Sequence, residues 1–146
     1  MSSTKPGKRR IGREAAIQFL YSNELNDDTN PEQIDAFWEL RPLRQDARIF
    51  ATELVIGVLK HREAIDSVLT KKLENYRLER LAAVDRNILR LAIYEILFRE
   101  DVPNPVVINE AIEIAKRFAS TESSSFVNGL LDSIRKSQLS TQSPES

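Results

Sequence analysis

The feature that most constrains the fold is the spacing of apolar residues, which follows the period of an α-helix along almost the whole chain. Segment 84–99 is the most apolar, with a core stripe at helical intervals: Leu89, Ala92, Ile93, Ile96 and Leu97. Further apolar residues occupy much of its remaining circumference, which is typical of a central, buried helix. The alternation that marks a β-hairpin is absent. The sequence therefore predicts an all-α fold of about seven helices.

The predicted helices have recognisable beginnings and ends. They span residues 8–25, 31–41, 45–75, 84–99 and 105–119, with a last helix that ends near 136. Gly57 and the polar cluster at 60–63 are expected to divide 45–75 into two helices. Asn30 before Pro31, and Asn104 before Pro105, each predict an N-cap with proline at the first helical position.

The remaining segments have the composition of loops and tails. We expect a polar loop at 120–125, a flexible basic N-terminus at 1–7 and a polar, frayed tail at 137–146. No domain boundary is evident between them, so residues 8–136 are predicted to form the folded, all-helical part.

The composition provides few of the residue types that catalytic and metal sites use. The chain has no cysteine, one histidine (His61) and 4 glycines. These counts exclude disulfides, thiolate zinc sites, multi-histidine metal sites, a Rossmann fingerprint and a P-loop. His61 lies among charged residues and is expected on the surface, and the acidic pair at 27–28 has turn composition. The longest apolar run, Leu54–Leu59, is far too short to cross a membrane. The sequence predicts a cytoplasmic protein that is not an enzyme and needs no metal or cofactor.

The charges are balanced in total but unevenly distributed. The net charge is -1, yet residues 1–13 contain no acid and five basic residues: Lys5, Lys8, Arg9, Arg10 and Arg13. The segment lacks the apolar stretch of a secretory signal. A basic end on an acidic body favours a local contact with an anion. A solvated tail is the alternative, whereas a transit peptide is disfavoured because Glu14 and Glu24 come early.

The first predicted helix combines this basic end with an aromatic residue. At about 100° of rotation per residue, Arg10 and Tyr21 fall on one side of the helix. Arginine offers a fixed fork of donors to phosphate, and an exposed aromatic ring offers a stacking plane to an unpaired base. RNA is a candidate ligand for this side. Phe118 and Phe126 are most simply core residues.

Four motifs, in order along residues 8–135, resemble the NusB family. The first helix carries Arg9-Arg10-x-x-Arg13-Glu14-x-Ala16-x-Gln18-x-Leu20-Tyr21, and the apolar helix carries Asp85-Arg86-Asn87-Ile88-Leu89-Arg90 followed by Leu91-Ala92-Ile93-Tyr94-Glu95. The others are Val102-Pro103 with Val107-Ile108-Asn109-Glu110-Ala111-Ile112-Glu113-Ile114-Ala115-Lys116, and Phe126-Val127-Asn128-Gly129-Leu130-Leu131-Asp132.

The resemblance implies two helical bundles and a function in bacterial transcription antitermination. NusB proteins pair with NusE, a small-subunit ribosomal protein, and the pair binds boxA RNA in leaders of ribosomal RNA operons. That complex helps RNA polymerase resist termination. Residues 8–136 would then form a NusB-like RNA-binding domain.

The resemblance also implies which residues bind. RNA contact falls on Lys8, Arg9, Arg10, Arg13, Tyr21, Glu122, Phe126 and Asn128. The surface for NusE falls on Asp85, with Arg86 as a further residue. Ser125 stands where family members often have a basic residue, and Ala119-Ser120 where many have glycine after the aromatic residue.

Two rival functions fit parts of the sequence. A NusB-like domain of an RNA cytosine methyltransferase would need a nucleotide-binding α/β domain after residue 146. A helical protein-interaction module without an RNA role would leave the basic N-terminus as a solubilising tail. Binding to a boxA-like oligonucleotide, measured with and without the partner, discriminates an RNA-binding antitermination factor from an interaction module without an RNA role.

Overall fold

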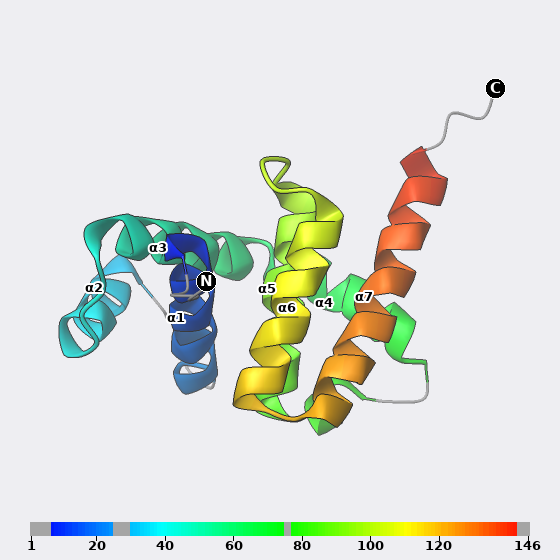
Figure 1. The fold of residues 1–146 in the computed structure, drawn as a ribbon, viewed down its shortest axis with the longest axis horizontal. Coiled ribbons are helices and arrows are strands. Elements are labelled where there is room, and N and C mark those ends of the chain that lie inside the picture. Colours follow the sequence, from blue (N-terminus) through cyan, green and yellow to red (C-terminus); the bar gives the residue numbers. More distant parts are fainter. Residues whose placement is uncertain (1–6, 25–29, 75–76, 143–146) are drawn as a thin grey trace, which may run out of the picture. The chain divides into compact units, whose positions relative to one another are not determined.

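A computed structural model describes residues 7–24, 30–74 and 77–142, with side chains up to residue 138. These residues form seven α-helices, one short 3-10 helix and no strand (Figure 1). The helices are α1 (Lys8–Ser22), α2 (Pro31–Leu40), α3 (Gln45–Lys60), α4 (Arg62–Leu73), η1 (Leu78–Arg80), α5 (Ala83–Phe98), α6 (Asn104–Phe118) and α7 (Thr121–Gln142). The predicted all-α class is confirmed.

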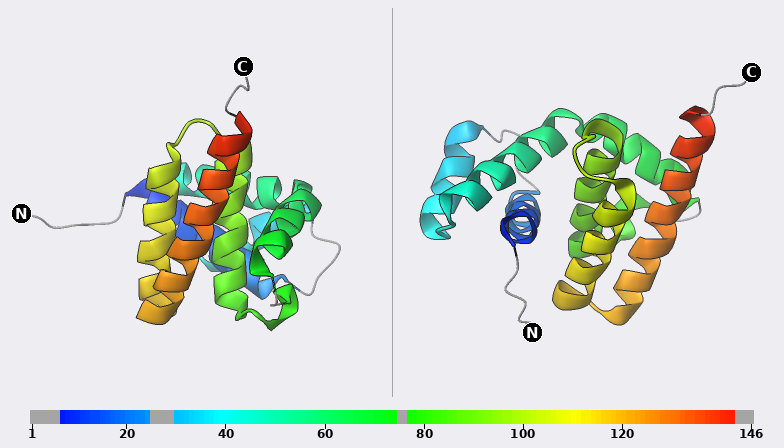
Figure 2. Two further views of the ribbon diagram at one scale, coloured as in Figure 1. Left: turned by 90° about the vertical axis from the view of Figure 1, so that its right-hand side faces the viewer. Right: turned by 45° about the horizontal axis from the view of Figure 1, so that its top comes forward.

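The chain divides into two compact units, residues 1–60 and 61–146, called unit 1 and unit 2 below. In unit 1, α1 packs along α3. In unit 2, α6 packs against both α5 and α7, and α4 packs against α5 and α7. Figure 2 shows α6 and α7 side by side in both views. Two helical bundles, as expected, therefore make up the fold.

Unit 1 is built around aromatic side chains. Phe19 and Phe37 meet edge to face with ring centroids 5.2 Å apart, and Phe37 meets Trp38 in the same way at 5.4 Å. Trp38 is buried, and its indole Nε1 donates a hydrogen bond of 2.9 Å to Oγ1 of Thr52. A buried tryptophan needs such a partner for its N–H. This bond joins α2 to α3.

Gly12 sets how closely α1 approaches α3. A Cβ atom at Gly12 would lie 2.8 Å from Cδ2 of Phe50 and 3.2 Å from the carbonyl oxygen of Ala47. Both distances are shorter than ordinary van der Waals contact. The missing side chain thus lets the backbone of α1 lie directly on the ring of Phe50 and on α3.

Unit 2 is built around α5, the helix predicted to be central. Leu89 and Ile93 are fully buried there, and more than half of the residues of α5 are buried. Arg90 is also buried, and its Nε and Nη2 donate to the two carboxylate oxygens of Asp66 on α4 at 2.8 and 3.1 Å. Removing one partner of a buried ion pair strands the other, which typically costs about 3–5 kcal/mol. This pair therefore fixes α4 on α5.

Some predicted boundaries are confirmed and others are shifted. Asn30 caps α2 in a reciprocal capping box with Gln33. Asn104 is not a cap: it is the first residue of α6, and the carbonyl of Pro103 accepts the first backbone bonds, from Val106 and Val107. The first helix ends at Ser22, short of the predicted Leu25, which lies outside the described residues.

The break between α3 and α4 falls at His61, inside the predicted polar cluster, whereas Gly57 is buried within α3. His61 is half-buried, so the prediction of a surface histidine is only partly right. Its ring stacks on Phe98 with centroids 3.9 Å apart and planes 14° apart. Residues far apart in sequence make this contact, which composition could not indicate.

The predicted loop at 120–125 is wrong, because α7 begins at Thr121. Oγ of Ser120 accepts a bond from the backbone N–H of Ser123, and the Ser120 carbonyl accepts one from Ser124. Serine favours helix beginnings for this reason, so the serine-rich segment is a helix start. The helix also continues to Gln142 instead of ending near Lys136, since no glycine or proline interrupts residues 130–142.

Substitution by alanine at two helical glycines is expected to change the stability of the protein in opposite directions. Gly12→Ala places a methyl group against Phe50 and Ala47, and we expect it to destabilise unit 1 by about 1–3 kcal/mol. Gly129 lies within α7 without a positive φ. Apart from its chain neighbours and the backbone of its own helix, no atom of the described residues lies within 4 Å of the place that a Cβ atom would take there. We expect Gly129→Ala to stabilise the protein by about 0.5–1 kcal/mol, because alanine is the better helix former.

Urea unfolding of both variants and of the parent protein measures these changes. Equal effects of the two substitutions, in either direction, would contradict the close approach of α1 and α3.

Candidate nucleic-acid interface

The basic end of α1 presents cationic side chains to solvent. Lys8 and Arg9 are exposed, and Arg10 is half-buried. Helix α1 begins at Lys8, and its first turn contains no acidic residue. The concentration of positive charge predicted from the sequence is therefore accessible to an anion. Lys5 lies outside the described residues.

Tyr21 lies at the other end of α1 and is 51% exposed. Between the two ends, Ile17 is buried and contributes to the core. At 1.5 Å per residue, about 16 Å along the helix separates Arg10 from Tyr21. The basic and aromatic ends thus form two separate contact points on one helix.

Arg13 differs from the other predicted RNA residues because it is only 3% exposed. Its guanidinium lies over the ring of Phe50, with Cζ 5.5 Å from the centroid. A buried guanidinium is poorly placed to reach the phosphates of an RNA on the surface. The structure therefore favours a supporting position for Arg13, inside unit 1.

Phe50 is the residue that sequence reasoning missed. Its ring, on α3, lies beneath two guanidinium groups of α1: Cζ of Arg9 is 5.0 Å from the centroid and Cζ of Arg13 is 5.5 Å. Such distances are typical of cation–π contacts. The spacing of four residues between the arginines places them on one face of α1, but no local signal connects that face with residue 50.

The predicted contacts on α7 lie in unit 2. Glu122 is exposed in the first turn, and Phe126, one turn later, is half-buried. Asn128 is exposed but lies about 200° around the helix from Phe126, at about 100° per residue. Glu122 and Phe126 therefore share a face of α7, whereas Asn128 does not join them.

The aromatic residues expected in the core are only partly there. Phe118, at the end of α6, is 40% exposed, and Cζ of Arg117 lies 5.4 Å from its ring centroid. The helical stripe assigned Phe118 to the core, but it is the last residue of α6. The arginine side chain covers part of a ring that the core does not.

The residues predicted to bind a partner are held by contacts within unit 2. Oδ2 of Asp85, in the first turn of α5, accepts a bond of 3.2 Å from Oγ of Ser123 on α7. Its Oδ1 is buried and accepts no hydrogen bond from the described part of the chain. Nη1 of Arg86 donates to the carbonyl oxygens of Leu78 and Leu81 at 3.2 and 2.6 Å. Arg86 thus fastens η1 to α5.

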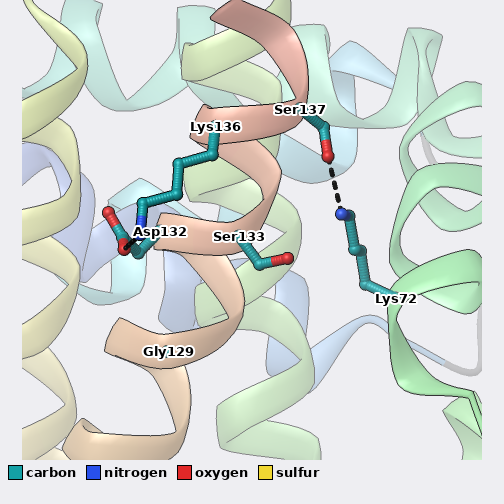
Figure 3. A pocket seen from close by; sticks show the side chains of 6 residues that line it. All are labelled: Lys72, Gly129, Asp132, Ser133, Lys136 and Ser137. Atoms are coloured by element: carbon teal, nitrogen blue, oxygen red, sulfur yellow. Dashed lines mark hydrogen bonds and ion pairs between the residues drawn. The ribbon is translucent and has the colours of Figure 1, made fainter. Parts of the chain in front are cut away.

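A polar groove of about 470 Å³ lies between α4 and α7 (Figure 3). Nζ of Lys72 donates to Oγ of Ser137 at 2.6 Å, and Nζ of Lys136 lies 3.1 Å from Oδ2 of Asp132. Both lysines therefore have partners within the groove. Six residues line it: Lys72, Gly129, Asp132, Ser133, Lys136 and Ser137.

The described residues contain neither a candidate metal site nor a candidate membrane-spanning helix. Residues 7–24, 30–74 and 77–142 contain no group of three or more metal-binding side chains. None of the helices in those ranges combines the length and hydropathy that a bilayer crossing requires. The charged face of α1 remains the most distinctive chemical feature.

Known proteins with the same pattern identify the family. The model of the NusB family matches residues 10–136. The transcription antitermination protein NusB of Thermodesulfovibrio yellowstonii is 42% identical over 142 residues, covering 90% of this chain and 94% of the relative. NusB of Myxococcus xanthus is 46% identical over 132 residues, covering 88% and 94%.

Solved structures agree with the sequence relatives. A structure of antitermination factors NusB and NusE in complex with dsRNA contains a chain that is 30% identical, with a TM-score of 0.80. The similarity covers 89% of this chain and 97% of that one. Both the sequence and the fold lead to one conclusion: the chain belongs to the NusB family.

Proposed function

We propose that the chain is a transcription antitermination factor that binds boxA RNA of ribosomal RNA operon leaders as a heterodimer with NusE. The complex helps RNA polymerase resist termination. The observation that carries the proposal is the exposed basic beginning of α1, with Tyr21 exposed at its other end. Membership of the NusB family and the similarity to a chain solved with NusE and RNA support it.

Lys8, Arg9 and Arg10 supply the electrostatic part of RNA binding. Their charges attract phosphates without reading sequence. Tyr21 supplies a plane for an unpaired base. Glu122 and Phe126 form a second contact region on one face of α7, in which Phe126 is the stacking residue. Asn128, on another face of α7, makes a separate contact with the RNA.

The partner surface includes Asp85, whose carboxylate suits a basic ribosomal protein such as NusE. Arg86 contributes by fastening η1 to α5, through its hydrogen bond to the carbonyl oxygen of Leu78. The protein acts as a non-enzymatic adaptor in the cytoplasm, where nascent RNA and RNA polymerase meet, and it needs no cofactor.

The salt dependence of RNA binding tests the basic contacts. For about three phosphate contacts to a single strand, the logarithm of the binding constant falls with that of the salt concentration at a slope of about −2. Replacing both Arg9 and Arg10 by alanine is expected to flatten the slope by about 1.4. Fluorescence titration of a boxA-like oligonucleotide in the presence of NusE gives the slope.

Arg41→Ala, an exposed substitution in the same unit, is the matched control. An unchanged slope in the double variant, with unchanged folding, would remove these arginines from the interface and favour a protein-interaction module without an RNA role.

Stacking on Tyr21 makes a separate prediction. Tyr21→Ala is expected to weaken binding of single-stranded boxA RNA by about 1–3 kcal/mol, whereas Tyr21→Phe keeps the ring and most of the affinity. A duplex of the same sequence, whose bases are already stacked, is expected to bind both variants equally. Equal affinity of both variants for the single strand would instead make Tyr21 a surface residue without contact.

The charge of Asp85 is tested in the partner complex. Asp85→Asn retains an oxygen that can accept the bond from Ser123, so it changes charge more than fold. We expect at least a tenfold loss of NusE affinity, about 1.4 kcal/mol, in calorimetric titration. Ser123→Ala removes the internal bond but keeps the charge, and it is expected to bind NusE as the parent protein does. Equal losses in both variants would assign Asp85 a structural role only.

A further inference from the structure

We infer that Phe50 is a positioning residue for RNA binding: its buried ring fixes the guanidinium of Arg9 in the orientation that receives phosphate. The inference rests on the proposed function and adds a residue that lies outside the surface itself. Phe50 is only 7% exposed. It therefore acts through the arginines above it and does not touch RNA.

The geometry gives the ring two cations and a fixed place. Cζ of Arg9 is 5.0 Å from the ring centroid, and Cζ of Arg13, one turn further along α1, is 5.5 Å away. Arg13 is buried, so its contact with the ring is shielded from water, whereas Arg9 is exposed above the same ring. The ring of Phe50 thus contacts both the buried Arg13 and the exposed Arg9.

Gly12 makes this arrangement possible. Cδ2 of Phe50 lies 2.8 Å from the position that a Cβ of Gly12 would take, so the ring occupies the space that any other residue would fill. Because the backbone of α1 at Gly12 packs against one side of the Phe50 ring, the ring has little room to move with the side chain of Arg9. It forms a rigid platform beneath Arg9.

A rigid platform has a physical consequence for phosphate binding. A free arginine side chain loses rotamer freedom when it binds, at a cost typical of long side chains. An arginine already stacked on a ring has lost part of that freedom before RNA arrives, which raises affinity through preorganisation. A guanidinium that is stacked by its face carries its N–H donors along its edge, which is the part that binds phosphate.

The decisive experiment is a double-mutant cycle between Phe50→Leu and Arg9→Ala, read as affinity for a boxA-like RNA with NusE present. Leucine keeps an apolar side chain but removes the aromatic face. We expect Phe50→Leu to weaken binding about fivefold in the parent protein and less than 1.5-fold in the Arg9→Ala background. Phe50→Tyr, which retains the ring, is expected to bind within twofold of the parent.

Phe37→Leu is the matched control, because it makes the same change in unit 1 at a ring that contacts Phe19 and Trp38. It is expected to lower stability but to leave RNA affinity within twofold. The side-chain Nε signals of Arg9 and Arg13 in ¹⁵N NMR provide a second readout. They are expected to shift in Phe50→Leu, through loss of the ring current, and to stay in place in Phe37→Leu.

The outcomes separate the inference from the proposed function. A parent protein that binds no RNA overturns both. A parent that binds, with Arg9→Ala weakened but Phe50→Leu unchanged, overturns the positioning role alone. Independent, multiplying effects of Phe50→Leu and Arg9→Ala also overturn it. Phe50→Met, whose flexible side chain fills irregular space, replaces Phe50→Leu in the cycle if the leucine variant does not fold.

Discussion

The contact between α1 and α3 at Gly12 is the constraint on which the candidate interface depends. Without a side chain at this position, α1 lies directly on the ring of Phe50 and on the backbone of α3. The same contact buries Arg13 and leaves Arg9 exposed above the ring. Helix α1 thus serves two purposes at once, with an apolar side that completes the core of unit 1 and a basic beginning that faces solvent.

The helical core of unit 2 contains buried charged side chains. Arg90 is buried on α5 and is matched by both carboxylate oxygens of Asp66, while Asp85 reaches Ser123 at the beginning of α7. Each bond links α5 to another helix. These bonds act like the hydrogen bond between Trp38 and Thr52 in unit 1, because directional polar contacts between helices select one packing among many that would bury the same apolar area.

Sequence reasoning succeeded where one helix determines its own structure. The stripe of α5 and the N-cap at Asn30 depend on residues within a few positions of each other, and both predictions are confirmed. It failed where the position of a residue depends on a contact with a distant part of the chain, or where the local signal for a helix start is weak. The serine-rich start of α7 resembles a loop until Ser120 is seen to accept the bond from Ser123. The burial of Arg13 and the stacking of His61 on Phe98 depend on partners from other helices, as does the placement of Phe50 beneath two arginines.

Residue-resolved chemical modification of arginine, with a glyoxal reagent and mass spectrometry, is the sharpest test of whether the basic beginning of α1 lies on RNA. Rates are compared for the NusE complex with and without boxA RNA. We expect RNA to slow modification of Arg9 and Arg10 several-fold and to leave exposed Arg41 unchanged, with Arg13 slow in both states because it is buried. Unchanged rates at Arg9 and Arg10, under conditions in which RNA is bound, would contradict a role for these arginines in the interface.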